Sequence, residues 1–262
     1  MYSFEIVRPK SVADAVSALG EEEAQALGGG QTLIPSLKQR LAAPAVLVSL
    51  ASIDEIKGVS SSGGAVTIGG GTPHGTVARD VAASYPALAA LAGNIGDPAV
   101  RSRGTVGGSL ANNDPAACYP AAALASGATI VTSNREIAAD DFFEGLFTTA
   151  LEDGEIITAV KFRIPEKAAY IKFEQPASRF ALVGVFVAKF ADGVRVAVTG
   201  ASEDGVFRWT EAEAALSGDF SAAALDGLAV GADGLMTDLH GSAAYRAHLI
   251  GVLTKRAVTQ AG

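Results

Sequence analysis

The sequence predicts an α+β protein in which two α/β subdomains precede a compact domain made of a sheet and several helices. Three observations lead to this prediction. Helical and strand-like segments alternate as far as Pro165, two long strand-like runs form a hairpin within residues 183–200, and helical stretches dominate after residue 210. Helical segments are distinguished from strand-like segments by the spacing of their apolar residues. We expect domains at residues 1–55, 56–166 and 167–262.

The first domain begins with a helix. Ser11 can cap it, apolar residues follow at helical spacing, and Gly20 can close it. A short apolar run at residues 24–27 then leads into a glycine cluster. A helix-like stretch at 33–41 and the β-rich residues 46–50 follow, which completes a small α/β unit.

The second domain contains another glycine cluster, followed by a helix start. Thr72 can cap free amides, and Pro73 loses nothing at the first helical position. The segments expected here are, in order, a strand at 65–68, helices at 73–83 and 86–92, and strands at 129–131 and 155–164.

The third domain differs from the first two in the order of its elements, with a pair of long strands followed by helices. Strands at 183–190 and 194–200 flank Asp192-Gly193, a pair typical of a type I′ turn. Helices are then expected at 210–216, 221–228 and 242–259.

Composition excludes several classes of protein. The chain has 262 residues, 49% of them apolar, and a net charge of −8 with only 20 basic residues, which argues against nucleic acid as a partner. No apolar run approaches the ~18 residues of a membrane span, and the start lacks a secretory signal, so we expect a cytoplasmic protein. The single cysteine, Cys118, cannot form an internal disulfide, and alone it cannot ligate zinc or an iron–sulfur cluster.

Glycine is the first functional clue. The chain has 30 glycines, about 11% of its residues against a usual value of roughly 7%, and they cluster at 28–30, 69–71 and 104–108. These clusters match neither G-x-G-x-x-G nor the Walker pattern. Consecutive glycines nevertheless leave amides uncovered, so that several N–H groups can converge on a phosphate. The first and third clusters adjoin hydroxyl side chains and would suit the two phosphates of a dinucleotide. Tight turns at strand ends are the alternative.

The sequence around the clusters resembles a known family. Ala-Leu-Gly-Gly-Gly-Gln-Thr-Leu-Ile-Pro at 26–35 and the long stretch at 95–116 resemble the FAD-binding medium subunit of bacterial molybdenum hydroxylases, the carbon monoxide dehydrogenase and xanthine dehydrogenase family. Further matches lie at residues 4–9, 153–158, 170–172, 178–183 and 245–249. The resemblance covers essentially the whole chain in order. It implies the vanillyl-alcohol-oxidase (PCMH) type of FAD-binding fold.

The resemblance also implies the positions of the cofactor contacts. The first pyrophosphate loop would consist of Gly28, Gly29, Gly30, Gln31 and Thr32, with Leu27 and Leu33 at its edges. The second would consist of Thr105, Gly107, Gly108 and Ser109. Ile95 would lie against the isoalloxazine ring, main-chain groups of Ile157 would meet the ring system or the adenine, and Lys172 would be a cation near the flavin.

Several assignments keep an alternative. Lys172 could be a solvated lysine at a strand end, and Arg101 is expected at the surface. His74 is expected to be a capping or surface residue, and Trp209 a packing residue. The sequence departs from the family at Cys118, where the usual residue is an aspartate that accepts hydrogen bonds from FAD. A thiol is a poor acceptor, so Asp114 or Asn113 could stand in, and Cys118 itself could be a small buried thiol.

By the same resemblance, this chain carries FAD and contributes neither catalytic residues nor metal ligands. A large partner subunit would hold the molybdenum cofactor and a small partner its 2Fe-2S clusters, with two such heterotrimers forming a dimer. Electrons would pass from the clusters to the FAD and on to an external acceptor. Two alternatives are a self-sufficient flavin oxidase of the same fold and a structural subunit that has lost FAD.

Overall fold

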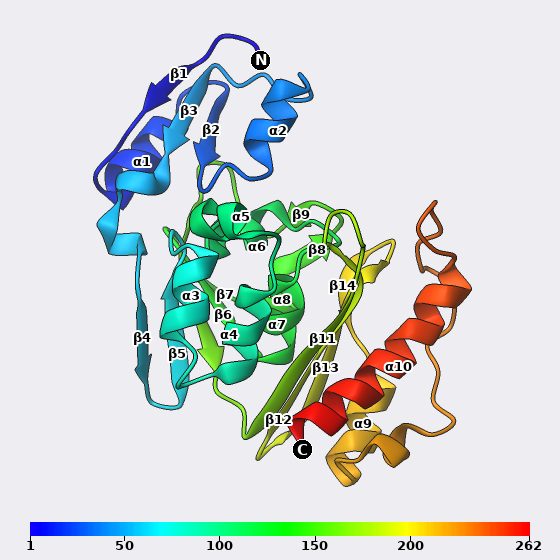
Figure 1. Cartoon of the computed structure of the whole chain (residues 1–262). Coiled ribbons are helices and arrows are strands. Elements are labelled where there is room, and N and C mark those ends of the chain that lie inside the picture. The colour runs from blue at the N-terminus through cyan, green and yellow to red at the C-terminus, as the bar shows by residue number, and fades with distance from the viewer.

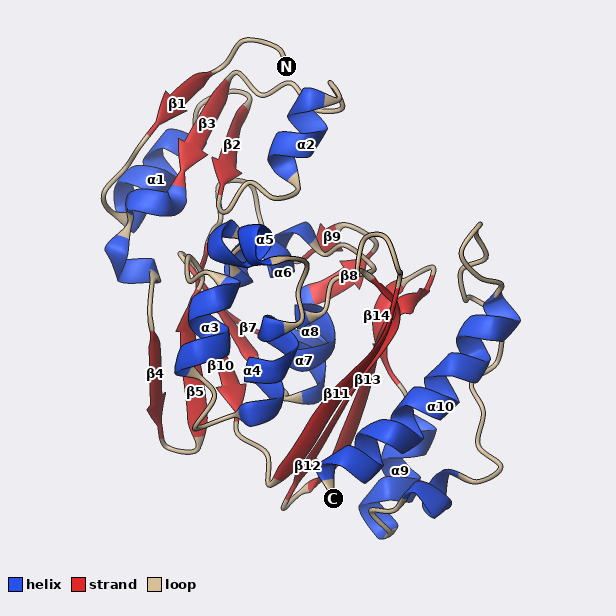
Figure 2. Ribbon diagram, in the orientation of Figure 1, coloured by secondary structure: helices blue, strands red, loops and turns tan.

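A computed structural model describes all residues, 1–262, and confirms the predicted α+β class (Figures 1 and 2). The N-terminal unit is a parallel sheet in the order β1 (Glu5–Val7), β3 (Val46–Ser49), β2 (Ala24–Leu27). Its helices are α1 (Val12–Leu19) and α2 (Leu33–Lys38), and two short 3-10 turns, η1 (Leu50–Ser52) and η2 (Asp54–Ile56), lead out of it. The predicted cap is confirmed, because the Ser11 side chain accepts the Asp14 N–H.

The second unit is a five-stranded antiparallel sheet. Its order is β4 (Val59–Ser62), β5 (Ala65–Gly69), β10 (Ile157–Arg163), β6 (Thr129–Thr132) and β7 (Glu136–Ala138). The helices of this unit are α3 (His74–Asp80), α4 (Pro86–Gly93), α5 (Pro98–Arg103), α6 (Val106–Asn112), α7 (Tyr119–Ala125) and α8 (Ala139–Phe142). A small hairpin pairs β8 (Phe143–Gly145) with β9 (Thr148–Thr149).

The third unit is an antiparallel meander of β11 (Lys167–Glu174), β12 (Ala181–Phe190), β13 (Gly193–Ser202) and β14 (Gly205–Arg208). It is followed by α9 (Thr210–Gly218), the 3-10 turn η3 (Ala222–Leu225) and α10 (Ala243–Ala261). The division of the chain into domains at 1–55, 56–166 and 167–262 stays a prediction. None of the helices combines the length and the apolar character needed to cross a membrane.

Three local predictions were wrong. Thr72 does not cap α3, because its hydroxyl is bonded to the main chain of Gly58, and Pro73 is the capping residue. The β12–β13 turn is not type I′, since its central residues, Ala191 and Asp192, lack the positive φ that this turn requires. The helix expected at 221–228 shrinks to the single turn η3.

The C-terminal sheet is covered on both faces. Helices α9 and α10 pack on the outer face, and α4 and α7 of the second unit pack on the inner one (Figure 1). Residues 181–188 of β12 are all buried for this reason, which explains why the strand is a continuous apolar run rather than an alternating one. The arrangement also places one face of β11 beside the helices of the second unit.

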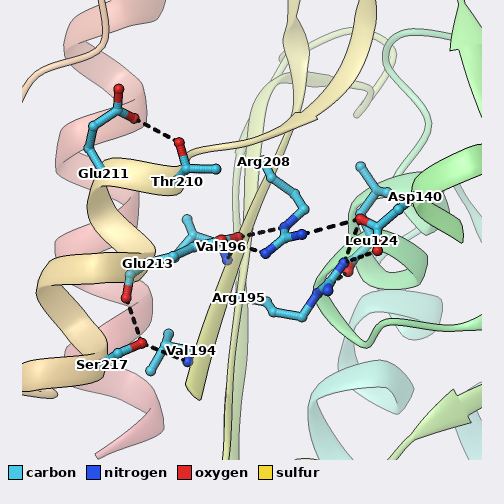
Figure 3. Close-up of polar contacts among 10 residues, drawn as sticks. All are labelled: Leu124, Asp140, Val194, Arg195, Val196, Arg208, Thr210, Glu211, Glu213 and Ser217. Carbon is cyan, nitrogen blue, oxygen red and sulfur yellow. Dashed lines mark hydrogen bonds and ion pairs between the residues drawn. The ribbon is translucent and has the colours of Figure 1, made fainter. Parts of the chain in front are cut away.

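Two arginines tie the C-terminal sheet to the second unit (Figure 3). Arg195 on β13 donates to the Leu124 carbonyl at 2.8 Å and to both carboxylate oxygens of Asp140. Arg208 on β14 lies 3.4 Å from the same aspartate and pairs with Glu213 of α9 at 2.6 Å. Asp140 thus joins two strands of the third unit to α8 of the second.

Arg246 anchors α10 to the sheet from within the core. Its side chain is 2% exposed and pairs with Asp238 at 2.8 Å. The same guanidinium donates to the carbonyls of Leu182 and Gly200 at 2.7 and 2.6 Å. These are charge-assisted hydrogen bonds in a desolvated place, where loss of one partner is costly.

Replacing Arg246 with Met should therefore destabilise the protein by about 3–5 kcal/mol, because two buried carbonyls and a carboxylate lose their donor. Chemical denaturation measures this. Arg256→Met, on the exposed face of the same helix and without an ion pair, is the matched control. Equal unfolding midpoints for the two variants would contradict the anchoring role.

Candidate functional site

The first and third glycine clusters lie against each other, at the place where the N-terminal unit meets α5 and α6 (Figure 1). A Cβ atom on Gly29 would be 2.0 Å from the Arg103 carbonyl oxygen. A Cβ atom on Gly28 would be 3.2 Å from the Thr105 hydroxyl. Only glycine allows this approach at position 29. The structure therefore brings together the two loops that were predicted separately.

The first loop presents a row of free amides. None of the main-chain N–H groups of residues 28–32 donates to another group of the protein. These residues are partly buried or exposed, so a ligand can reach their amides. The Gln31 side chain donates back to the Gly29 carbonyl at 3.2 Å and leaves the amides uncovered. Leu27 and Leu33 flank the row and are partly buried. Five uncommitted donors in succession are well suited to an anion.

The second loop differs, because most of its amides are bonded internally. Gly107 donates to the Gly70 carbonyl at 2.8 Å, Gly108 to the Thr105 hydroxyl at 3.1 Å and Ser109 to the Thr105 carbonyl at 3.0 Å. The donors of this loop that remain free are the Thr105 amide and the hydroxyls of Thr105 and Ser109. None of these three groups donates to an acceptor in the protein.

The middle glycine cluster packs the second loop onto the sheet. A Cβ atom on Gly70 would lie 2.1 Å from the Ile157 carbonyl oxygen, and one on Gly107 would lie 2.8 Å from the Gly70 carbonyl oxygen. The Ile157 side chain belongs to the core, and its Cγ2 would lie 3.4 Å from the same Cβ atom on Gly70. Gly70 and Gly107 are thus needed for backbone contact.

A second group of predicted residues gathers around Lys172. Its ammonium donates to the Asn94 carbonyl at 2.7 Å and to the Arg179 carbonyl at 2.9 Å, and lies 3.9 Å from the Cys118 sulfur. The side chain is 1% exposed, so the alternative of a solvated lysine was wrong. Cys118 is 6% exposed, and burial raises the pKa of its thiol, which keeps it protonated at neutral pH.

Neighbouring polar residues have structural partners. Arg101 was expected at the surface, but its guanidinium donates to the carbonyls of Ile95 and Gly96 at 3.2 and 3.0 Å and holds that turn. The Asn113 amide donates to the carbonyls of Gly145 and Thr148 and so holds the small hairpin. Asp114 accepts the Ala116 N–H at 2.8 Å.

His74 is a further residue whose surroundings differ from the sequence prediction, which placed it as a capping or surface residue. It is 5% exposed, and a Cβ atom on Gly104 would be 2.7 Å from its Nε2. On the other side its ring lies 5.3 Å from that of Tyr119, next to Cys118. The buried His74 Nδ1 and Tyr119 Oη have no hydrogen-bond partner. His74 therefore connects the glycine loops to the group around Lys172, and its position three residues after Gly71 was the one available signal.

Comparisons with known proteins agree with this geometry. Residues 2–167 match the family model described as the FAD binding domain in molybdopterin dehydrogenase. The chain is 32% identical to the carbon monoxide dehydrogenase medium chain of Afipia carboxidovorans, over 99% of this chain and 96% of that one. It is 34% identical to the nicotine 6-hydroxylase medium subunit of Paenarthrobacter nicotinovorans, over 97% and 95%.

Solved structures are similar over the whole chain. Reconstituted CO dehydrogenase from Oligotropha carboxidovorans superposes with a TM-score of 0.90 at 32% identity, covering 99% of this chain and 98% of that one. Quinoline 2-oxidoreductase from Pseudomonas putida 86 superposes with a TM-score of 0.89 at 28% identity, covering 99% and 97%. These matches confirm the predicted fold.

Burial makes His74 sensitive to acid. Desolvation, with the nearby charge of Arg101, lowers the pKa of His74 from 6.5 to about 4. The unfolded chain therefore takes up the proton first as the pH falls. The stability associated with neutral His74 is present above pH 6.5 and is lost as the pH falls towards 4, an effect of about 3 kcal/mol.

His74→Gln should make the loss of stability between pH 6.5 and 4 shallower. Denaturant titrations at several pH values measure the slope. His240→Gln, at an exposed position, is the control and should keep the wild-type slope. Parallel curves for wild type and His74→Gln would show that His74 is not held neutral by burial.

Proposed function

The chain belongs to the family of FAD-binding domains of molybdopterin dehydrogenases, and on this basis we propose that it is the electron-transfer subunit of a molybdenum-containing hydroxylase or dehydrogenase. The similarity to medium chains extends over nearly the whole length of this chain and of each relative. This is therefore a medium subunit that binds FAD and works in a multi-subunit complex. Its task would be to take electrons from a small iron–sulfur subunit and pass them to an external acceptor.

The row of free amides at residues 28–32 is the observation that best supports this proposal. A dinucleotide brings two phosphates, and these amides have no competing acceptor in the protein. The Thr105 hydroxyl lies beside Gly28 and can donate to the same region. Glycine leaves no side chain between the amides and a phosphate. The residues present therefore fit FAD, with Gly28, Gly29, Gly30, Gln31 and Thr32 as proposed phosphate contacts, joined by Thr105 and Ser109.

The ring end of the site is proposed to lie near Lys172. That side chain donates to the carbonyl of Asn94, the residue before Ile95, and Arg101 donates to the carbonyls of Ile95 and Gly96. Ile95 is thus held in one position by two cations that bond to the backbone around it. An apolar side chain held in this way can support one face of a flat ring. The places of Gly107, Gly108, Asp114, Cys118 and Ile157 in the cofactor site stay predictions.

The bound FAD would supply the redox chemistry, since a flavin can accept electrons one at a time and release them as a pair. The protein would supply position and electrostatics. We expect a large molybdopterin-binding subunit and a small 2Fe-2S subunit as partners, in a dimer of heterotrimers in the cytoplasm. The acceptor could be NAD, a quinone, a carrier protein or dioxygen.

The alternatives receive less support. A self-sufficient flavin oxidase needs a substrate domain, and this chain matches medium chains from end to end. A structural subunit without FAD would have no use for five uncommitted amides beside a junction that only glycine allows at position 29.

Substituting Gly29 with Ala should weaken FAD binding at least about tenfold, or about 1.4 kcal/mol. The new methyl group would collide with the Arg103 carbonyl and push the two loops apart. Quenching of flavin fluorescence during titration measures the affinity. Gly231→Ala, where a Cβ atom meets nothing within 4 Å, is the control and should bind as wild type does. If both variants bind equally, the loop contact does not shape the site.

The isolated chain should show no hydroxylase activity on heterocycles or aldehydes, because substrate chemistry belongs to a partner in this proposal. Its flavin should be reduced by an organic substrate only after both partner subunits are added. Bleaching of the flavin absorbance follows this reaction. Turnover by the chain alone would instead indicate the self-sufficient oxidase.

A further inference from the structure

The charge of Lys172 is buried without being neutralised by its closest partners. Its ammonium donates to two main-chain carbonyls, those of Asn94 and Arg179, at 2.7 and 2.9 Å. Carbonyl oxygens solvate a cation and fix its position, but they carry no net charge. The side chain is 1% exposed, so water contributes little screening.

The third side of the ammonium faces a neutral group. The Cys118 sulfur lies 3.9 Å from Nζ, and burial raises the pKa of that thiol. The Tyr170 hydroxyl lies beside the same thiol, and burial raises its pKa as well. Both groups are therefore protonated and uncharged at neutral pH, and neither balances the ammonium.

One carboxylate lies within 4 Å of the ammonium. Glu174 is two residues after Lys172 on the same strand, so the two side chains leave the same face of β11. Its Oε1 is 3.8 Å from Nζ, beyond hydrogen-bond distance, and its side chain is 36% exposed. Solvent weakens such a pair, so Glu174 offsets only part of the positive charge.

This cation lies at the end of the site proposed for the flavin ring. The Lys172 ammonium is bonded to the carbonyl of Asn94, the residue before Ile95, and it lies 3.9 Å from the Cys118 sulfur. Ile95 and Cys118 are positions expected to border the cofactor. A flavin carries more negative charge when it is reduced, and a nearby cation stabilises that form and raises the reduction potential. The size of the effect depends on how much of the charge is balanced by neighbours.

We propose that Cys118, Lys172 and Glu174 together set the reduction potential of the flavin, with the neutral thiol at position 118 leaving the lysine charge largely unbalanced. Position 118 is then the tuning position, because a carboxylate there would lie within reach of Nζ. This proposal rests on FAD binding at the proposed site. It concerns the reduction potential of the flavin, whereas the glycine loops determine the affinity for FAD in the proposed function.

The test is a spectroscopic redox titration of the full-length chain loaded with FAD, using reference dyes. Lys172→Met should shift the potential downward, and Lys172→Arg, which keeps the charge, should retain most of the wild-type value. Cys118→Asp should also shift it downward, and Cys118→Ser, its uncharged counterpart, should move it much less. Glu174→Gln should shift it upward, because it removes the remaining compensation.

The opposite signs at Lys172 and Glu174 are decisive, since general loosening of the site would not produce them. If Lys172→Met does not retain FAD, the half-exposed Glu174→Gln variant alone decides by its upward shift. Equal potentials in wild type, Cys118→Asp and Glu174→Gln, with FAD bound in all three, would overturn this inference and leave the proposed function intact. Failure of the wild-type chain to bind FAD would overturn both.

Discussion

The main-chain contact between Gly28–Gly29 and residues 103–105 is the constraint on which the candidate site depends. A Cβ atom on Gly29 would overlap the Arg103 carbonyl at 2.0 Å, so the two loops can meet only as bare backbone. This contact joins the small parallel sheet to the antiparallel one. It also leaves the amides of residues 28–32 without acceptors in the protein. The same place in the structure thus holds both the junction and a row of free amides that would suit an anion.

A second constraint shapes the other end of the site. The C-terminal sheet is covered on both faces, with α4 and α7 on its inner side, and this buries Lys172 of β11 among groups from three segments of the chain. His74 connects the two ends, because it packs on Gly104 and faces Tyr119, the neighbour of Cys118. The site thus has a part rich in free N–H donors and a part with a fixed positive charge. That combination suits a cofactor with phosphates at one place and a redox ring at another.

Local signals predicted much of the fold, and the errors have identifiable physical reasons. Ser11 and the apolar residues after it predicted α1, and the long alternating and apolar runs predicted β12 and β13. Helix α7 was missed because all its residues are buried, which removes the amphipathic period. Strand β4, largely serine, carries no strand propensity. The positions of the glycine loops were predicted, but the burial of His74 and of the Lys172 side chain depends on tertiary contacts that no short sequence window contains.

Hydrogen–deuterium exchange with and without FAD tests the central claim most directly. The amides of residues 28–32 have no acceptor in the protein, so they should exchange rapidly in the free chain and become protected when FAD is added. The amides of Gly107, Gly108 and Ser109 are already bonded internally and should change much less. Unchanged exchange at residues 28–32 in the FAD-bound protein would contradict the assignment of this loop to the cofactor phosphates.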